Sequence, residues 1–368
     1  MCAKASQGPT DAAQDHLFLS GQYVMAQTQA KLAAAIVGAS GYAGSELTRL
    51  LLQHPNVDLQ HLYVSAKSTD AGKTIAEIDP RLTGRTTLAL EPLTDPAQAA
   101  RSLDIVFLAT DHAVSAAVAP VFNAAGCTVF DLSGAYRLSD PADYPKYYGF
   151  EHAAPECLKK ALYALGEFVN VKALQATDLV SLPGCYPTAS QLALKPLIDA
   201  GFLDSTAKPV IDAVSGVSGA GRKAKLSSAF CEVSLSAYGV FTHRHRPEIE
   251  EHLGRRVIFT PHLGPFKRGI LATITARLSP EAAGSGAREK IAAAYEAAYA
   301  GKPLVRLRTE LPKLDDVTNL PFCDIGFTTD GEDIIILSAI DNLLKGASAQ
   351  AVQVMNLKFG FPETTALL

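Results

Sequence analysis

The stretch AAAIVGASGYAGSELTRLL, residues 33–51, determines the fold of the first part of the chain. Its apolar run over residues 33–37 predicts a buried strand, and the pattern of residues 45–52 predicts a helix. Between them, glycines 38, 41 and 44 follow the spacing GxxGxxG. Glycine at a strand-to-helix turn lets the backbone approach a pyrophosphate, which the N–H groups at the helix start attract. The stretch therefore predicts a dinucleotide-binding loop, with a packing turn that binds nothing as the alternative. The predicted cofactor contacts in this loop are Gly38, Ser40, Gly41, Tyr42, Ala43 and Gly44.

The residues that follow continue the alternation of strands and helices. Strands are predicted at residues 59–64, 103–109 and 128–131, with a helix ending at Ala125 between the last two. Such alternation is typical of a parallel sheet with helices on both faces.

Beyond residue 185 the pattern changes to strands with one long helix, over residues 287–300. A mixed or antiparallel sheet domain is the simplest interpretation. A final helix over residues 343–357 is expected to pack back on the first domain. The predicted strands are residues 210–214, 231–237, 257–260, 270–278, 322–327 and 334–340.

The end of the second strand indicates which dinucleotide binds. NAD-preferring folds usually place a carboxylate there for the ribose 2′-hydroxyl. This chain instead has Ser65, Lys67 and Ser68, with no acidic residue before Asp70. Hydroxyls and a cation suit a 2′-phosphate, so the predicted cofactor is NADP. A solvated lysine without a ligand is the alternative.

Cys185 stands in the segment PGCYPT, residues 183–188, directly after the apolar run 179–182. The run predicts a buried strand, and Thr188 with Gln191 has the pattern of a capping box at a helix start. A cysteine at a helix start is expected to have a lowered pKa, because N–H groups and the helix dipole favour the thiolate. Together with a nicotinamide cofactor, this predicts acyl-enzyme chemistry at Cys185.

Two further segments carry candidate site residues. The second glycine-rich loop, SGVSGAGR over residues 215–222, ends in Arg222, which offers a contact for an anionic substrate. His243 and His245 lie two residues apart, so they can share a face of an extended segment. A neutral imidazole there can activate a thiol and move protons, and the sequence does not decide which of the two acts.

Composition restricts the class of protein. Of 368 residues, 48% are hydrophobic and 19% charged, a balance typical of globular domains, and the length favours two of them. The formal net charge of -4 argues against a nucleic-acid or basic membrane-binding surface. The six cysteines are scattered, which favours neither a disulfide framework nor a metal site and fits the cytoplasm. Residues 1–30 resemble neither a signal nor a transit peptide, so we expect a loosely ordered extension.

Around Cys185 the chain resembles the N-acetyl-gamma-glutamyl-phosphate reductase family, and the resemblance covers residues 31–368. The matching segments occur in family order and include GASGYAG at 38–44, DLSGAYR at 131–137 and DNLLKG at 341–346. The others are SGVSGAGR at 215–222, HRH at 243–245, PHL at 261–263 and RGI at 268–270.

The resemblance implies NADPH-dependent reduction of an acyl phosphate to a semialdehyde in arginine biosynthesis, through a thioester on Cys185. It implies that Arg137 contacts the leaving phosphate, while Ser218, Gly219 and Asn342 line the nicotinamide side. It also implies a homodimer or homotetramer. The fold implied is like that of glyceraldehyde-3-phosphate dehydrogenase: a Rossmann-type NADP-binding domain and an α+β catalytic domain with a mixed sheet.

The expected division of the chain places the NADP-binding domain at residues 31–184, completed by a C-terminal helix within 342–368. The catalytic and dimerisation domain covers residues 185–341. Two alternatives remain: an aspartate-semialdehyde dehydrogenase with the same chemistry on a shorter substrate, and an NADP-binding sensor without catalysis.

Overall fold

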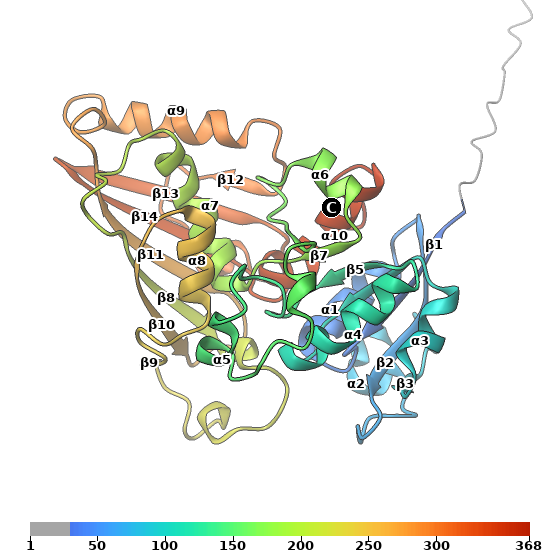
Figure 1. Cartoon of the computed structure of the whole chain (residues 1–368). Helices are drawn as coiled ribbons and strands as arrows, with labels where there is room; N and C mark the ends of the chain where they lie inside the picture. Colours follow the sequence, from blue (N-terminus) through green and yellow to red (C-terminus); the bar gives the residue numbers. More distant parts are fainter. Residues whose placement is uncertain (1–29) are drawn as a thin grey trace, which may run out of the picture. The chain divides into compact units, whose positions relative to one another are not determined.

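A computed structural model describes residues 30–368, and the extension expected at residues 1–30 lies outside this range except for its last residue. Two seven-stranded sheets organise the described residues (Figure 1). The first sheet is parallel throughout, in the order β3-β2-β1-β4-β5-β7-β6. Its strands are β1 (Leu32–Val37), β2 (Val57–Ser65), β3 (Leu90–Leu93), β4 (Ile105–Leu108), β5 (Thr128–Asp131), β6 (Leu162–Tyr163) and β7 (Leu179–Ser181).

Helices cover both faces of this sheet because its central strands are apolar on both sides. All side chains of β4 and β5 are buried. One face packs against α1 (Tyr42–Leu51) and α10 (Ala349–Phe359), the other against α4 (His112–Ala124). Shorter helices complete this part of the chain: α2 (Ile75–Ile78), α3 (Pro96–Ala99), α5 (Asp143–Tyr147) and α6 (Val171–Ala176).

The second sheet is mixed, in the order β12-β13-β14-β11-β8-β10-β9. The pairs β8–β10 and β12–β13 are parallel, and the other pairs are antiparallel. Its strands are β8 (Val210–Gly216), β9 (Ser236–Ala237), β10 (Ile258–Gly264), β11 (Ile270–Arg277), β12 (Val305–Leu307), β13 (Cys323–Asp330) and β14 (Asp333–Ile340). The two sheets confirm the predicted combination of a parallel and a mixed sheet.

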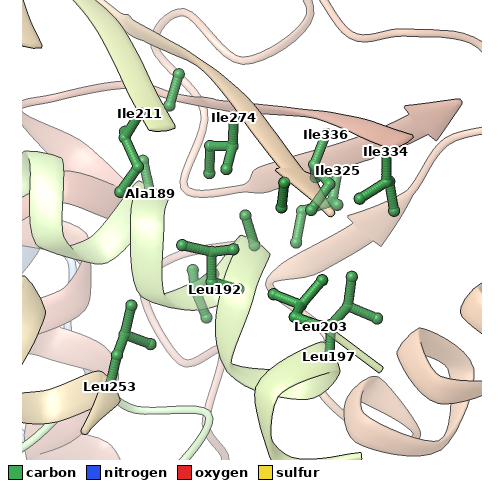
Figure 2. Packing of buried hydrophobic residues seen from close by; sticks show 14 of the residues in the cluster. Ala189, Leu192, Leu197, Leu203, Ile211, Leu253, Ile274, Ile325, Ile334 and Ile336 are labelled. Carbon is green, nitrogen blue, oxygen red and sulfur yellow. The ribbon is translucent and has the colours of Figure 1, made fainter. Parts of the chain in front are cut away.

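One face of the second sheet is covered by α7 (Cys185–Asp199), α8 (His245–Leu253) and α9 (Ala287–Tyr299). Figure 2 shows Leu192 and Leu197 of α7 on the side of the sheet that carries isoleucines of β8, β11, β13 and β14. Both leucines are fully buried. Truncating such a residue to alanine costs about 2–5 kcal/mol, so α7 is firmly held to the sheet. The residue at its first position is therefore held in place as well.

Three local predictions were wrong. Helix α7 begins at Cys185, three residues before the predicted capping box, and the Thr188 hydroxyl donates inside the helix to the Gly184 carbonyl at 2.9 Å. The strand expected over 231–237 forms only at its last two residues, because the preceding side chains lie exposed with no sheet neighbour. Helix α8 was not predicted, although Pro247 sits in its first turn, where a missing N–H costs nothing.

Candidate active site

Cys185 lies where the two sheets meet, at the first position of α7. Gly184, the residue preceding the helix, donates its backbone N–H to the Glu248 carboxylate at 2.8 Å. On the other side, a Cβ added at Gly346 would come within 2.8 Å of the Cys185 Cβ. Cys185 therefore lies between the turn at Gly184, which is held in place, and the backbone at Gly346. That backbone can approach Cys185 so closely only because residue 346 is glycine.

Burial raises the pKa of the Cys185 thiol above its ordinary value. The positive charges of Arg137 and Arg244 and the N–H of Tyr186 lower it, but they do not overcome the cost of burial. The predicted lowering of this pKa was therefore wrong for the free protein, although the N–H at the helix start acts in the predicted direction. Cys185 is nevertheless partly exposed, so a reagent can reach it.

Of the two candidate histidines, His245 is the one whose ring lies against the turn that precedes Cys185. A Cβ at Gly184 would lie 2.5 Å from the His245 Nε2. The His245 Nδ1 is buried without a hydrogen-bond partner among residues 30–368. Burial, followed by the charges of His243 and Arg244, lowers the pKa of His245 well below its ordinary value. Its imidazole is therefore neutral near neutral pH and can accept a proton.

His243 lies behind His245, further from the turn at Gly184. Its Nδ1 accepts the backbone N–H of His245 at 3.1 Å, and its ring packs edge-on against Tyr186, Tyr238 and Phe259. Burial, with the Arg244 charge, lowers the pKa of His243 to about 3. The two histidines lie in a turn and at a helix start, not in the extended segment that the sequence suggested.

Arg137 reaches the site, but protein acceptors use most of its donors. Its Nε donates to the Leu182 carbonyl and its Nη2 to the Leu132 carbonyl, both at 2.7 Å. Its Nη1 lies 3.4 Å from the Glu248 carboxylate and 3.5 Å from the His245 Nε2. The guanidinium is only 5% exposed. Arg137 thus joins the turns that follow β5 and β7.

Glu248 is a site residue that the sequence analysis missed. It is fully buried, and besides Gly184 and Arg137 it accepts a hydrogen bond from the Tyr163 hydroxyl at 3.0 Å. It follows His245 by three residues on α8, so both side chains face the same side of the helix. That spacing would have pointed to Glu248 if α8 had been predicted.

The first glycine loop has the backbone that a dinucleotide needs. Gly38 has a φ of 90°, and a Cβ there would overlap the Ala109 carbonyl. The N-terminus of α1 has no side-chain cap, so its N–H groups can bind a phosphate. A cavity of about 760 Å³ opens here, within the usual range for cofactor pockets. Its walls include Ser40, Gly41 and Tyr42 on one side and Ser218, Gly221 and Arg222 on the other.

Arg222 lies at this cavity and not with Arg137. Its Nη1 donates to the Ser40 carbonyl at 3.2 Å and to the Asp70 carboxylate at 2.6 Å. Asp70 follows the end of β2, where Ser65 and Lys67 are exposed and Ser68 is half-buried. The predicted substrate contact is thus placed beside the predicted contacts for the cofactor's 2′-phosphate.

The second glycine loop and the end of β14 also meet. The Asn342 side chain donates to the Ser218 hydroxyl at 3.0 Å and accepts the backbone N–H of Gly269 at 2.7 Å. A Cβ at Gly219 would lie 3.7 Å from the Asn342 amide nitrogen. Asn342 therefore meets Ser218 and Gly219, although more than a hundred residues separate them in the sequence.

A parallel dinucleotide-type sheet, joined to a mixed sheet with a cysteine at the junction, defines the class of semialdehyde dehydrogenases. Residues 33–176 match the semialdehyde dehydrogenase NAD binding domain, and residues 185–342 match the semialdehyde dehydrogenase dimerisation domain. This chain belongs to the N-acetyl-gamma-glutamyl-phosphate reductase family, which confirms the resemblance found in the sequence. Relatives of that name include the protein of Yersinia pseudotuberculosis, 60% identical over 334 residues, and that of Escherichia coli O6:H1, 57% identical over 334 residues. Each alignment covers 90% of this chain and 98% of the relative.

Solved structures share the fold at much lower identity. A probable aspartate-semialdehyde dehydrogenase from Pseudomonas aeruginosa has a TM-score of 0.66 and 21% identity. Aspartate semialdehyde dehydrogenase with NADP from Candida albicans has a TM-score of 0.65 and 16% identity. In both comparisons 89% of this chain and 98% of the other chain are covered. These similarities confirm the predicted fold class.

Proposed function

We propose that this chain reduces N-acetyl-gamma-glutamyl phosphate to N-acetylglutamate semialdehyde with NADPH, through a thioester on Cys185, in arginine biosynthesis. The observation that carries the mechanism is the convergence of His245, Arg137 and Glu248 on the turn at Gly184, directly before Cys185. Relatives that are 60% identical over nearly their whole length support the choice of substrate.

The walls of the 760 Å³ cavity would hold NADP. The residues at the start of α1 would bind its pyrophosphate, and Ser65, Lys67, Ser68 and Arg222 would contact its 2′-phosphate. Ser218, Gly219 and Asn342 would lie on the nicotinamide side. When bound, NADPH supplies the hydride that reduces the thioester carbon.

Covalent chemistry takes place at the sulfur of Cys185. Neutral His245 takes the thiol proton as the sulfur attacks the acyl carbon, so that no free thiolate has to form in the buried site. The carbon–sulfur bond forms, the carbon–oxygen bond to phosphate breaks, and His245 gives its proton to the departing phosphate. After reduction, the carbonyl re-forms as the carbon–sulfur bond breaks. The sulfur leaves as a thiolate, which a proton from water returns to the thiol.

Glu248 and Arg137 position these groups. Glu248 fixes the Gly184 N–H and so the start of α7, and Arg137 holds the turns that precede it. The opposite charges of Glu248 and Arg137 compensate each other, because burying either charge without a partner would destabilise the fold.

The enzyme acts on a small molecule and phosphate as a homodimer or homotetramer in the cytoplasm. The face of the second sheet opposite its helices carries partly exposed side chains such as Ile335 and Leu337, which suits contact with a second copy. Residues 31–184 and 185–341 are the functional domains in this proposal. Over residues 30–368, no helix combines the length and apolar character that a membrane span requires.

The decisive experiment measures phosphate-dependent reduction of NADP with N-acetylglutamate semialdehyde and, in parallel, with aspartate semialdehyde. We expect turnover of the first substrate and its near-complete loss in Cys185→Ser, with NADP binding retained. A preference for aspartate semialdehyde, or more than a few per cent of turnover in Cys185→Ser, would refute the proposal. No turnover of either substrate would favour a sensor.

A further inference from the structure

Several buried polar groups have no hydrogen-bond partner among residues 30–368, and besides the His245 Nδ1 they include the Nε of Arg244 and the hydroxyl of Tyr148. Arg244 precedes α8, between the two histidines. No hydrogen bond or ion pair to its side chain is present within that range, whereas Arg137 has Glu248. Buried polar groups are normally satisfied, so a pair of unmet donors in a candidate site points to a missing acceptor.

Tyr148 is fixed so that its ring cannot turn away. The ring packs edge-on against His112 with 5.0 Å between ring centres, and a Cβ added at Gly134 would overlap it. His112 is fixed in turn, because its Nδ1 accepts the Gly134 N–H at 2.7 Å. These contacts hold the ring and leave the hydroxyl free. Gly134 and Arg137 belong to the same segment after β5.

The positive charge of Arg244 affects the pKa values of several groups in the site. It lowers the pKa of the Cys185 thiol, after the larger effects of burial and Arg137, and it also acts on His112, His245 and Tyr148. Burial, helped by Arg244 and Arg137, lowers the pKa of His112 to about 3, so His112 adds no charge near neutral pH. Glu248 is the carboxylate that faces this group, and Arg137, Tyr163 and Gly184 already occupy it. The site therefore has an uncompensated positive charge in the absence of a ligand.

We propose that Arg244 and the Tyr148 hydroxyl bind the phosphoryl group of the acyl phosphate, and inorganic phosphate in the reverse direction. This rests on the proposed function. The phosphoryl oxygen is bonded to the very carbon that the sulfur attacks, whereas the substrate's carboxylate lies at the far end of its carbon chain. A cation close to Cys185 therefore meets the phosphoryl group. Arg137, to which the family resemblance assigned this role, has two of its donors on backbone carbonyls.

The test is the KM for inorganic phosphate in the semialdehyde-oxidising reaction of full-length protein. Arg244→Gln removes a charge-assisted contact and should raise this KM about 10- to 100-fold, and Tyr148→Phe should raise it about 2- to 10-fold. The KM for N-acetylglutamate semialdehyde should change less than about twofold. Arg246→Gln is the matched control: the Arg246 Nε is likewise buried without a hydrogen-bond partner among residues 30–368, but Arg246 lies on α8 with the Glu250 carboxylate 4.0 Å away to offset its charge, so its replacement should leave both KM values unchanged.

A second measurement uses inorganic phosphate as the probe without turnover. Phosphate should slow the alkylation of Cys185 by iodoacetamide in the wild type and in Arg246→Gln, and protect much less in Arg244→Gln. If wild type shows no turnover but phosphate protects through Arg244, the proposed function fails and the phosphate site stands. If Arg244→Gln does not fold, Tyr148→Phe and Arg244→Lys provide the same comparison.

Two outcomes would overturn the inference. One is a rise in the KM for the semialdehyde with an unchanged KM for phosphate, which would assign Arg244 to the substrate's carboxylate. The other is unchanged phosphate protection and an unchanged phosphate KM in folded Arg244→Gln and Tyr148→Phe, which would leave these side chains a structural role.

Discussion

Substituting alanine for Gly184 tests whether the geometry around Cys185 determines its reactivity. The added Cβ would lie 2.5 Å from the His245 Nε2 and 2.7 Å from the Arg137 Nη1. Non-bonded carbon atoms ordinarily stay about 3.5 Å or more from their neighbours. One or both of these side chains must therefore move by about 1 Å. Arg137 is held by two backbone carbonyls at 2.7 Å. The displacement therefore falls mainly on His245.

The size of the effect follows from that displacement. A shift of about 1 Å in a catalytic group can cost about 100-fold in rate, which corresponds to about 2.7 kcal/mol of barrier. Overpacking should also lower the free energy of unfolding by about 1–3 kcal/mol. We expect kcat to fall about 100-fold in Gly184→Ala, while NADP binding at the distant glycine loop stays unchanged.

A steady-state assay of semialdehyde oxidation, NADP titration and thermal unfolding separate these effects. Gly326→Ala is the matched control, since Gly326 lies in β13 and a Cβ there would lie 2.8 Å from the Glu310 carbonyl, a comparable conflict outside the site. It should lower stability and leave kcat unchanged. If Gly184→Ala keeps more than about half of wild-type kcat, or if Gly326→Ala loses as much, positioning by this turn is not what sets the rate.

Three further predictions concern Arg137, the cofactor and pH. Arg137→Lys cannot serve both backbone carbonyls and should reduce the free energy of unfolding by about 1–3 kcal/mol with little change in phosphate KM; a raised phosphate KM at unchanged stability in urea titrations would contradict this. Lys67→Glu should reduce or invert the preference for NADPH over NADH, and equal use of both cofactors by the unmutated protein would count against the assignment. His243 has a pKa lowered to about 3, so the unfolded chain binds more protons below pH 6.5, and stability should fall as pH falls from about 6.5 towards 3. The free energy of unfolding should change by about 1.4 kcal/mol per pH unit for each such histidine. In His243→Asn, the free energy of unfolding from urea titrations should therefore depend less steeply on pH. An unchanged slope would show that His243 does not titrate on unfolding.

The fold could be predicted where local pattern and tertiary environment agree. The glycine loop and the apolar runs of β1, β5 and β14 are buried on the faces that their sequences indicate, so their positions were close to correct. The segment 231–237 has a strand-like composition, but most of it has no neighbouring strand. Short strands such as β3 and β12 carry too few residues for a periodic signal.

The site could be predicted only as a set of residue types. The sequence and its resemblance identified Cys185, the two histidines and Arg137, and the structure brings His245 and Arg137 to the turn directly before Cys185. It did not show that the guanidinium of Arg137 is used by backbone carbonyls, since such bonds leave no trace in composition or spacing. The sequence analysis also did not predict the raised pKa of Cys185, because the burial of this residue depends on neighbours that are distant along the chain.

The position of α10 has a consequence for how the chain folds during synthesis. Val352 and Met355 lie in the same core cluster as Ile36 of β1 and Leu47 of α1, so the last helix completes a core that the first strand begins. The strands of the second sheet, by contrast, are all complete by Ile340. On the ribosome, the second sheet can thus assemble while the nucleotide-binding core still lacks one wall. That core closes only when α10 has left the exit tunnel, and a chain cut short before Ala349 would expose its apolar face to aggregation.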